Sequence, residues 1–294
     1  MIRFAEVMLG SGGPARCVRC HGPREDATYL PAAKLATSLR ETCGSWEGRP
    51  GPNVMLAGPE PFGHPELPRV VGAAMAAGCA RLGLDTDGAA LQSRQNAAGA
   101  LSAGVRHLRV RILAGAPGSH DALAGAPGAL DAAVAGLRAF REAADAASAS
   151  TSIAVLVTVC RHNVHDLPGA VALAVECGAD RVELHLDDPG LGLASSAAWI
   201  RAACDTGVVN GVWVEVDGMP FCAMPGYELH LSDVLRARTG AKSAACGACA
   251  LDAVCAGCAP LASADQLAEL APVANGERLA AGIARARAGE ATAE

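Results

Sequence analysis

Residues 54–65 read Val-Met-Leu-Ala-Gly-Pro-Glu-Pro-Phe-Gly-His-Pro, which joins a short apolar run to a loop rich in proline and glycine. A short apolar run bounded by turn residues is typical of a buried strand. Pro65 suits the first turn of a helix, where a missing N–H costs nothing. We therefore expect a strand at Val54–Ala57, a rigid turn and a helix at Pro65–Ala80. Glu60 lies at the centre of this turn. It is either an exposed carboxylate in a plain connection or part of a rigid edge that receives an amine-bearing ligand.

The same rhythm of strand and helix continues along the chain. Further strands are expected at Phe4–Leu9, Arg81–Leu84, His107–Leu113, Ile153–Cys160 and Arg181–His185. Further helices are expected at Ala89–Ala103, Ala129–Ala149, Asp166–Cys177 and Ser195–Cys204. Repeated strand–helix units imply a parallel sheet with right-handed crossovers. The sequence thus predicts the α/β class, as a partial (β/α)6 TIM-type barrel or a doubly wound sheet, and we favour the barrel.

The rhythm ends near Gly218, after a seventh expected strand at Val212–Val216. The following segment is rich in cysteine and ends in a helix-like tail. We therefore divide the chain into a barrel domain of residues 1–217 and a cysteine-rich, metal-binding appendage of residues 218–294. Within the barrel, Gly115–Gly128 is the most loop-like segment.

Composition excludes several classes of protein. Hydrophobic residues make up 51% of the chain and the net charge is -6, which disfavours disorder and a basic nucleic-acid-binding module. Aromatic residues make up only 3%, so a base-stacking platform is not expected. The longest apolar run is too short for a membrane span, and the first residues do not resemble a signal peptide. We expect a cytoplasmic protein that binds neither nucleic acid nor membrane.

The chain has 12 cysteines, and two groups of them are clustered. In the first loop, Cys17, Cys20 and His21 allow three interpretations: part of a dinucleotide-binding loop, a c-type haem attachment, or two thiolate ligands of an iron–sulfur cluster or other metal. We favour the thiolate ligands. Near the C-terminus, four cysteines follow the spacing C-x2-C-x5-C-x2-C, which can wrap one zinc ion or one iron–sulfur cluster. These four are Cys246, Cys249, Cys255 and Cys258.

Several loops together resemble those of radical S-adenosylmethionine (radical SAM) enzymes. The segment Leu56–Pro61, followed by His64-Pro65-Glu66, resembles the family's Gly-Gly-Glu-Pro motif and its His-Pro continuation. Asp85–Gly88 is similar to the family's Thr-Asn-Gly. The spacing of these elements agrees with the family from about residue 4 to residue 217. This agreement in spacing over most of the chain is more specific evidence of the resemblance than any single motif.

The resemblance assigns roles to individual residues. It implies that S-adenosylmethionine (SAM) is bound by Gly58, Pro59, Glu60, Pro61, Thr86, Asp87, Gly88 and Arg111. Arg111 would pair with the SAM carboxylate or ribose, although it could instead lie with Arg109 on a solvent-facing strand edge. The resemblance also implies a [4Fe-4S] cluster on Cys17 and Cys20. The family's first cluster cysteine is replaced by Gly13. The substitute ligand is left open among Cys43, His21, Ser11, Asp26 and an outside thiol.

The C-terminal cysteines resemble the SPASM and twitch appendages of the same family, with Cys222 as a further ligand. An auxiliary iron–sulfur cluster is implied there, and zinc remains open. The expected function is reductive cleavage of SAM to begin radical modification of a peptide or small natural-product substrate, with electrons from a donor such as ferredoxin or flavodoxin. The alternatives are a catalytically degenerate scaffold or partner-binding subunit with a C-terminal zinc or iron–sulfur site, and a zinc-stapled α/β domain with an unrelated activity.

Overall fold

The computed structural model describes residues 4–12, 26–44, 51–234 and 240–288. It contains a seven-stranded sheet with the strand order β1-β4-β5-β6-β7-β8-β9 and a separate two-stranded sheet. The described pairings of the large sheet are parallel. Its strands are β1 (Ala5–Met8), β4 (Asn53–Ala57), β5 (Arg81–Thr86), β6 (Val105–Arg111), β7 (Ser152–Val159), β8 (Arg181–Leu186) and β9 (Trp213–Asp217). The two-stranded sheet pairs β2 (Gly10–Ser11) with β3 (Thr28–Tyr29) in antiparallel fashion.

Helices connect the parallel strands, as the sequence predicts. Those of the strand–helix region are α2 (Ala32–Gly44), α3 (Leu67–Ala76), α4 (Arg94–Ser102), α5 (Pro117–Ala124), α6 (Ala129–Ala146), α7 (Leu167–Glu176) and α8 (Leu193–Val209). Two more helices, α9 (Ala264–Ala268) and α10 (Glu277–Ala288), follow in the C-terminal part of the chain. The α/β class of a partial TIM-type barrel is thereby confirmed. No helix among the described residues has the length and apolar character needed to span a bilayer.

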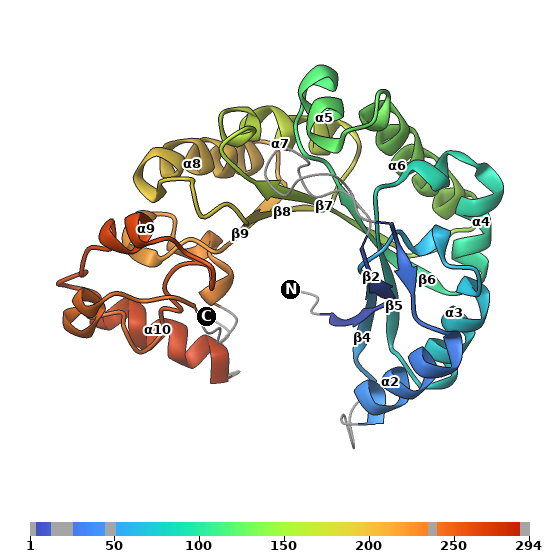
Figure 1. Cartoon of the computed structure of the whole chain (residues 1–294), viewed down its shortest axis with the longest axis horizontal. Coiled ribbons are helices and arrows are strands. Elements are labelled where there is room, and N and C mark those ends of the chain that lie inside the picture. The colour runs from blue at the N-terminus through green and yellow to red at the C-terminus, as the bar shows by residue number, and fades with distance from the viewer. Residues whose placement is uncertain (1–3, 13–25, 45–50, 235–239, 289–294) are drawn as a thin grey trace. The chain divides into compact units, whose positions relative to one another are not determined.

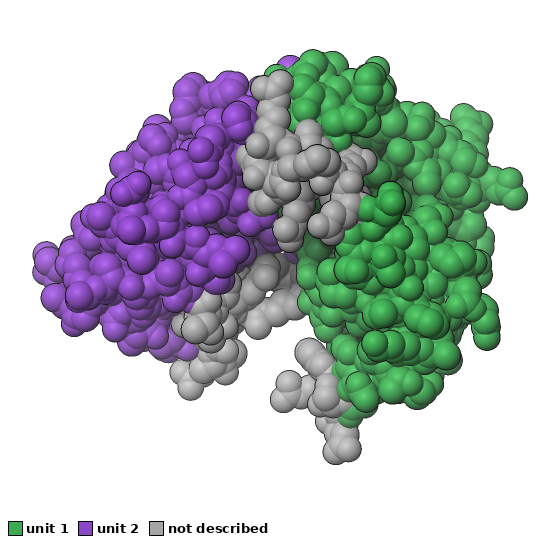
Figure 2. All heavy atoms as spheres, in the orientation of Figure 1, with its two compact units in different colours: residues 1–113, 117–156, 176–180 green, residues 114–116, 157–175, 181–294 purple. Residues whose placement is uncertain are grey.

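The chain divides into two compact units, which Figure 2 shows in green and purple. Unit 1 comprises residues 1–113, 117–156 and 176–180, and unit 2 comprises residues 114–116, 157–175 and 181–294. Strand β7 contributes to both. The division into a barrel and an appendage at residues 217 and 218 remains a prediction from the sequence.

In unit 1, strand residues alternate between two faces of the sheet because successive side chains of a strand point in opposite directions. Leu82, Leu84, Leu108 and Val110 are buried on one face. Helices α3, α4 and α6 lie along the strands of this unit (Figure 1). Helix α6 buries a stripe of residues at helical spacing, namely Leu130, Ala133, Leu137, Phe140 and Ala144. The opposite face of β5 and β6 carries charged side chains instead, and these form the candidate site.

Unit 2 contains β8, β9, α8 and the C-terminal region. Parallel strands β8 and β9 pair from Arg181 opposite Trp213 to His185 opposite Asp217. On β8, Arg181 contacts Glu183 at 2.5 Å, and His185 lies 3.9 Å from the same carboxylate. Glu183 and Glu215 are both buried. One face of β8 is therefore polar, and its Glu183 is paired with Arg181.

Three helices, α2, α5 and α9, were not expected from the sequence. Helix α2 occupies a segment for which no element was expected. Helix α5 lies inside the segment interpreted as the most loop-like. It starts at Pro117, whose fixed φ suits the first helical turn. Gly125 and Gly128 follow it with positive φ, so the glycines mark the end of this helix rather than the absence of one.

Candidate functional site

Three consecutive strands of unit 1 bring polar residues to one edge of the sheet. Glu60 follows β4, Thr86 ends β5 with Asp87 directly after it, and Arg111 ends β6. In parallel α/β folds the ligand site lies beyond the carboxyl ends of the strands. This is the edge at which the sequence places its candidate SAM-binding residues.

The Glu60 carboxylate is held in a fixed orientation by donors from the neighbouring strand. The Thr86 hydroxyl donates to Oε1 at 2.7 Å, and the Asp87 backbone N–H donates to Oε2 at 2.9 Å. The Phe62 backbone N–H approaches Oε1 at 3.4 Å. On the main chain, the Tyr29 hydroxyl donates to the Glu60 carbonyl at 2.8 Å. The carboxylate is thus part of the framework at this edge of the sheet, and the residue is half-buried.

The backbone around Glu60 and Thr86 depends on two glycines in the left-handed region. Gly58 has φ +100° and Gly88 has φ +83°, a conformation that strains residues with a Cβ. The Gly88 N–H donates to the Thr86 hydroxyl at 3.0 Å, which orients that hydroxyl for Glu60. Pro59 and Pro61 are buried in the β4 turn. They shape the loop, and the Pro61 carbonyl accepts a hydrogen bond from the His64 backbone N–H at 3.0 Å.

The pKa of Glu60 is raised from 4.5 to about 7. Burial is the largest cause, and the negative charge of Asp87 adds to it. The hydrogen bonds from Thr86 and Asp87 and the positive charge of Arg111 act in the opposite direction. A cation placed beside this carboxylate would favour its ionised form. The site is therefore suited to an ammonium group.

Arg111 belongs to a chain of alternating charges on the polar face of the sheet. Asp85 lies 2.8 Å from Arg111 Nε and 2.8 Å from Arg109 Nη2, and Arg109 Nη2 lies 2.7 Å from Glu6. Arg111 Nη2 also donates to the carbonyls of Asp85 at 3.3 Å and Gly58 at 3.5 Å. Burial raises the pKa of Asp85, but the two guanidinium groups outweigh it, so that the net pKa is lowered. Both arginines are buried, which rules out the solvent-facing alternative for this strand.

A cavity of about 220 Å³ adjoins these residues within unit 1. Asp87, Arg111 and His120 line it, together with a wall of small residues from the end of α5 to the start of α6. An engineered cavity of about 150 Å³ can hold benzene, so this space is large enough for an amino-acid-sized group. The buried His120 Nδ1 accepts a hydrogen bond from the Leu113 backbone N–H at 3.0 Å. His120 was not singled out from the sequence. The only signal for it in the sequence was its position seven residues after the strand expected at His107–Leu113.

The cysteines and Gly13 expected at an N-terminal cluster cannot be placed. Gly13, Cys17, Cys20 and His21 lie outside the described residues. Of the other candidates for the missing ligand, Ser11 and Asp26 are exposed, and Cys43 is buried near the end of α2.

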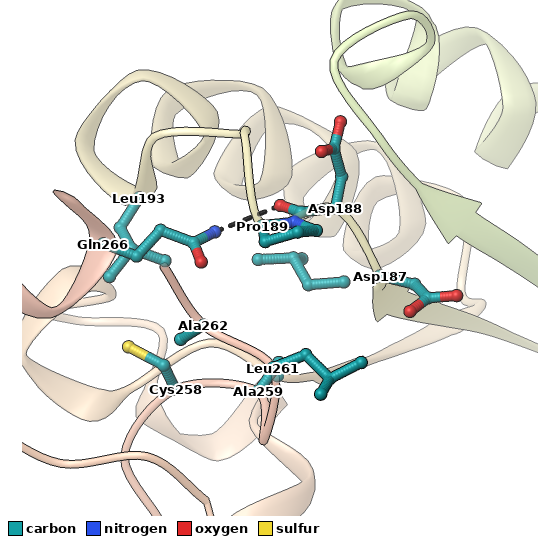
Figure 3. A pocket seen from close by; sticks show the side chains of 11 residues that line it. Asp187, Asp188, Pro189, Leu193, Cys258, Ala259, Leu261, Ala262 and Gln266 are labelled. Atoms are coloured by element: carbon teal, nitrogen blue, oxygen red, sulfur yellow. Dashed lines mark hydrogen bonds between the residues drawn. The ribbon is translucent and has the colours of Figure 1, made fainter. Parts of the chain in front are cut away.

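The C-terminal cysteines of unit 2 are divided between two pockets. Four of them line one pocket, namely Cys222, Cys246, Cys249 and Cys255. Cys258 lines the other with residues that follow β8 and β9 (Figure 3). Within the described ranges, no three His, Cys, Asp or Glu side chains are arranged closely enough to hold one metal ion. The donors of the first pocket are nevertheless thiols with an apolar surround, a donor set that suits zinc or an iron–sulfur cluster.

A polar contact connects the two sides of the second pocket (Figure 3). The Gln266 side chain donates to the carbonyls of Asp188 at 3.1 Å and Leu191 at 2.7 Å. The Asp188 carboxylate is held by Arg161 at 2.8 and 2.6 Å, and the pKa of Asp188 is lowered chiefly by these bonds. Gln266 therefore connects α9 to the loop that follows β8.

No protein-family model and no curated protein matches this sequence. Solved structures of SuiB from Streptococcus suis are similar in fold. SuiB bound to S-adenosylmethionine gives a TM-score of 0.57 at 15% identity, covering 75% of this chain and 52% of that chain. SuiB bound to the precursor peptide SuiA gives a TM-score of 0.55 at 14% identity, covering 71% of this chain and 47% of that chain. This chain thus spans about half the length of SuiB. At this identity the likeness shows a shared fold.

Proposed function

We propose that this protein is a radical SAM-type iron–sulfur protein that cleaves SAM reductively to begin radical modification of a peptide or small natural-product substrate. The observation that carries the proposal is the Glu60 carboxylate, held between β4 and β5 beside Arg111 and the adjoining cavity. This arrangement offers an acid for an ammonium group and a guanidinium for a carboxylate. An α-amino acid moiety, such as the methionine end of SAM, carries both groups.

The individual contacts support this pose. Glu60 already accepts two short hydrogen bonds, and its remaining lone pairs can accept from an ammonium group. Asp87 supplies a second negative charge at the cavity wall. The contacts described for Arg111 use Nε and Nη2, which leaves Nη1 for a ligand carboxylate. The ion pair with Asp85 holds the guanidinium in this orientation.

Cys17 and Cys20 would hold the N-terminal [4Fe-4S] cluster, and the identity of its third protein ligand is part of the proposal to be tested. When bound, that cluster would supply the electron for SAM cleavage, received from a donor such as ferredoxin or flavodoxin. The protein's own residues bind SAM, orient it and exclude water. Cytoplasmic location is proposed because the free thiols and such a cluster suit a reducing compartment.

The likeness to SuiB supports a peptide as the preferred substrate class. SuiB has been solved with SAM and with a precursor peptide, and its fold covers most of this chain. The extension to this chain is by analogy of fold.

The test is SAM binding and cleavage by the anaerobically purified, iron- and sulfide-reconstituted protein. Calorimetry would compare SAM with 5′-methylthioadenosine, which lacks the amino-acid end. Glu60→Gln should weaken SAM binding roughly tenfold or more, and should leave methylthioadenosine binding unchanged. Glu142→Gln is the matched control, because Glu142 is an exposed residue of α6 in the same unit.

Formation of 5′-deoxyadenosine with a reductant would establish cleavage. SAM binding without this product would favour the degenerate scaffold. Equal SAM affinity in the wild type and Glu60→Gln would refute the assignment of the site.

A further inference from the structure

The turn that carries Glu60 is joined to the segment that begins with β3. The Tyr29 hydroxyl donates to the Glu60 carbonyl at 2.8 Å. His64 Nε2 lies 2.9 Å from the Leu30 carbonyl. These contacts connect residues 31 and 34 positions apart, so they belong to the tertiary structure and not to the turn itself.

The Tyr29 ring is held by a buried histidine. The Glu66 N–H donates to His64 Nδ1 at 3.0 Å, so Nε2 carries the proton that is donated to Leu30. The imidazole packs edge-on against the Tyr29 ring, with 5.1 Å between the ring centroids. The Glu66 carboxylate also accepts from the Ala32 N–H at 3.1 Å, at the start of α2. The position of the ring is therefore fixed independently of its hydroxyl.

Gly63 leaves the space that the Tyr29 hydroxyl fills. A Cβ at Gly63 would lie 2.2 Å from Tyr29 Oη. The φ of Gly63 lies outside the positive region that favours glycine. What this glycine provides is therefore room for the hydroxyl, and a larger residue would push the hydroxyl away from the Glu60 carbonyl.

The hydroxyl is one of two donors to the Glu60 carbonyl. The second is the Gly63 N–H at 2.9 Å, and the Glu60 carboxylate is held separately by Thr86 and Asp87. Burial raises the pKa of the Tyr29 hydroxyl, and the negative charges of Glu60 and Asp87 raise it further. The hydroxyl therefore keeps its proton and donates at neutral pH. Its removal should loosen the orientation of Glu60 without unfolding the turn.

We propose that Tyr29 is a positioning residue of the candidate SAM site, which fixes the Glu60 main chain so that the Glu60 carboxylate meets the ligand's ammonium group. Tyr29 acts through Glu60. A carboxylate already held in its binding orientation loses little conformational freedom when the ligand arrives, so the hydroxyl should contribute to affinity for the amino-acid end alone. The inference rests on the proposed function for the identity of the ligand, and extends the site to a residue that none of its sequence motifs contains.

The experiment is calorimetry of SAM and 5′-methylthioadenosine with the anaerobically reconstituted full chain. Tyr29→Phe removes only the hydroxyl. It should raise the Kd for SAM roughly 3- to 10-fold and leave the Kd for methylthioadenosine unchanged. Tyr227→Phe is the matched control, because Tyr227 is the other tyrosine of the chain and its hydroxyl contacts Asp205 at 2.9 Å in unit 2. The control should leave both affinities unchanged.

A double-mutant cycle tests whether Tyr29 acts through Glu60. In the Glu60→Gln background, Tyr29→Phe should weaken SAM binding further by less than about twofold. A purely structural role would weaken SAM binding by the same factor in both backgrounds. Circular dichroism of each variant checks that it is folded.

Gly63→Ala is the second variant if Tyr29→Phe folds poorly. Its Cβ should displace the hydroxyl and weaken SAM binding in the same way. Gly72→Ala in α3 is its control, because a Cβ there meets no atom within 4 Å.

Unchanged SAM affinity in folded Tyr29→Phe, an equal loss for methylthioadenosine, or equal factors in the two backgrounds would each overturn the inference. Formation of 5′-deoxyadenosine together with any of these results would leave the proposed function standing. The expected affinities without 5′-deoxyadenosine would refute reductive cleavage and leave the inference standing. A wild type that does not bind SAM would overturn both.

Discussion

Replacement of Glu60 by glutamine should make the ligand-free protein more stable at pH 8 while weakening its affinity for SAM. The substitution keeps the shape of the side chain. The glutamine carbonyl can accept from the Asp87 N–H, and its amide can donate to the Thr86 hydroxyl, which then turns its own hydrogen away. The weaker contact with the Phe62 N–H is lost. The change therefore removes a negative charge with little loss of hydrogen bonding.

The magnitude follows from the pKa. A carboxyl whose pKa rises from 4.5 in the unfolded chain to about 7 in the fold is neutral in both states below pH 4.5 and costs no stability there. As pH rises from 4.5 through 7, the unfolded state ionises first, and the folded state loses relative stability. The full cost is roughly 3 kcal/mol above pH 7. Allowing roughly 1 kcal/mol for imperfect hydrogen bonds, Glu60→Gln should gain about 2 kcal/mol of stability at pH 8 and lose about 1 kcal/mol at pH 4.5.

Urea unfolding of the wild type and the variant at pH 5 and pH 8 measures this difference. Glu142→Gln serves as the control for removal of a negative charge. It breaks only an exposed contact with Arg94 at 3.4 Å, and should change stability by less than about 0.5 kcal/mol at either pH. A Glu60→Gln variant that is less stable than the wild type at pH 8, or whose advantage is the same at both pH values, would refute the reasoning.

Three further substitutions test other contacts. Asp85→Asn leaves two buried guanidinium groups without their shared carboxylate, so the free energy of unfolding measured in urea should fall by roughly 3–5 kcal/mol. A fall below about 1 kcal/mol would contradict the buried ion pairs. Gln266→Ala removes hydrogen bonds to two backbone carbonyls, so it should destabilise the protein by roughly 2 kcal/mol and speed hydrogen exchange in the loop after β8. Unchanged hydrogen exchange in this loop would argue against the contact. Gly190→Ala places a Cβ 1.6 Å from Arg161 Nη2 and should displace the Arg161 side chain. Because Arg161 lowers the pKa of Asp188, this pKa should rise in an NMR titration, and an unchanged pKa would exclude the displacement.

The regular part of the fold could be predicted from the sequence because each buried strand is a short apolar run between turn residues. The expected strand at Val54–Ala57 differs from β4 by one residue. Helix α5 was missed because the glycines around it obscured the helical start that Pro117 marks. Helix α8 extends from Leu193 to Val209, beyond the expected Ser195–Cys204, although Val208 and Val209 at its end are exposed.

The candidate site was only partly predictable. Glu60, Thr86 and Asp87 could be found because the chain places them directly after two neighbouring strands. The pairing of Asp85 with Arg109 and Arg111 depends on the register of β5 against β6, which the sequence does not specify. The presence of Cys222 in one pocket with Cys246, Cys249 and Cys255 depends on contacts between segments that are distant in the sequence, which motif spacing does not encode.

The alternating charges from Glu6 through Arg109 and Asp85 to Arg111 also constrain how this protein can evolve. Loss of an inner charge alone leaves an uncompensated charge on a buried neighbour, whereas replacement of paired charges together by apolar residues of similar volume can be nearly neutral. The effects of substitutions here should therefore be strongly non-additive, and Asp85 and Arg109 should change in concert. A mutational path that changes them one at a time passes through a less stable protein, so drift at these positions should be slow even where function no longer requires the ligand.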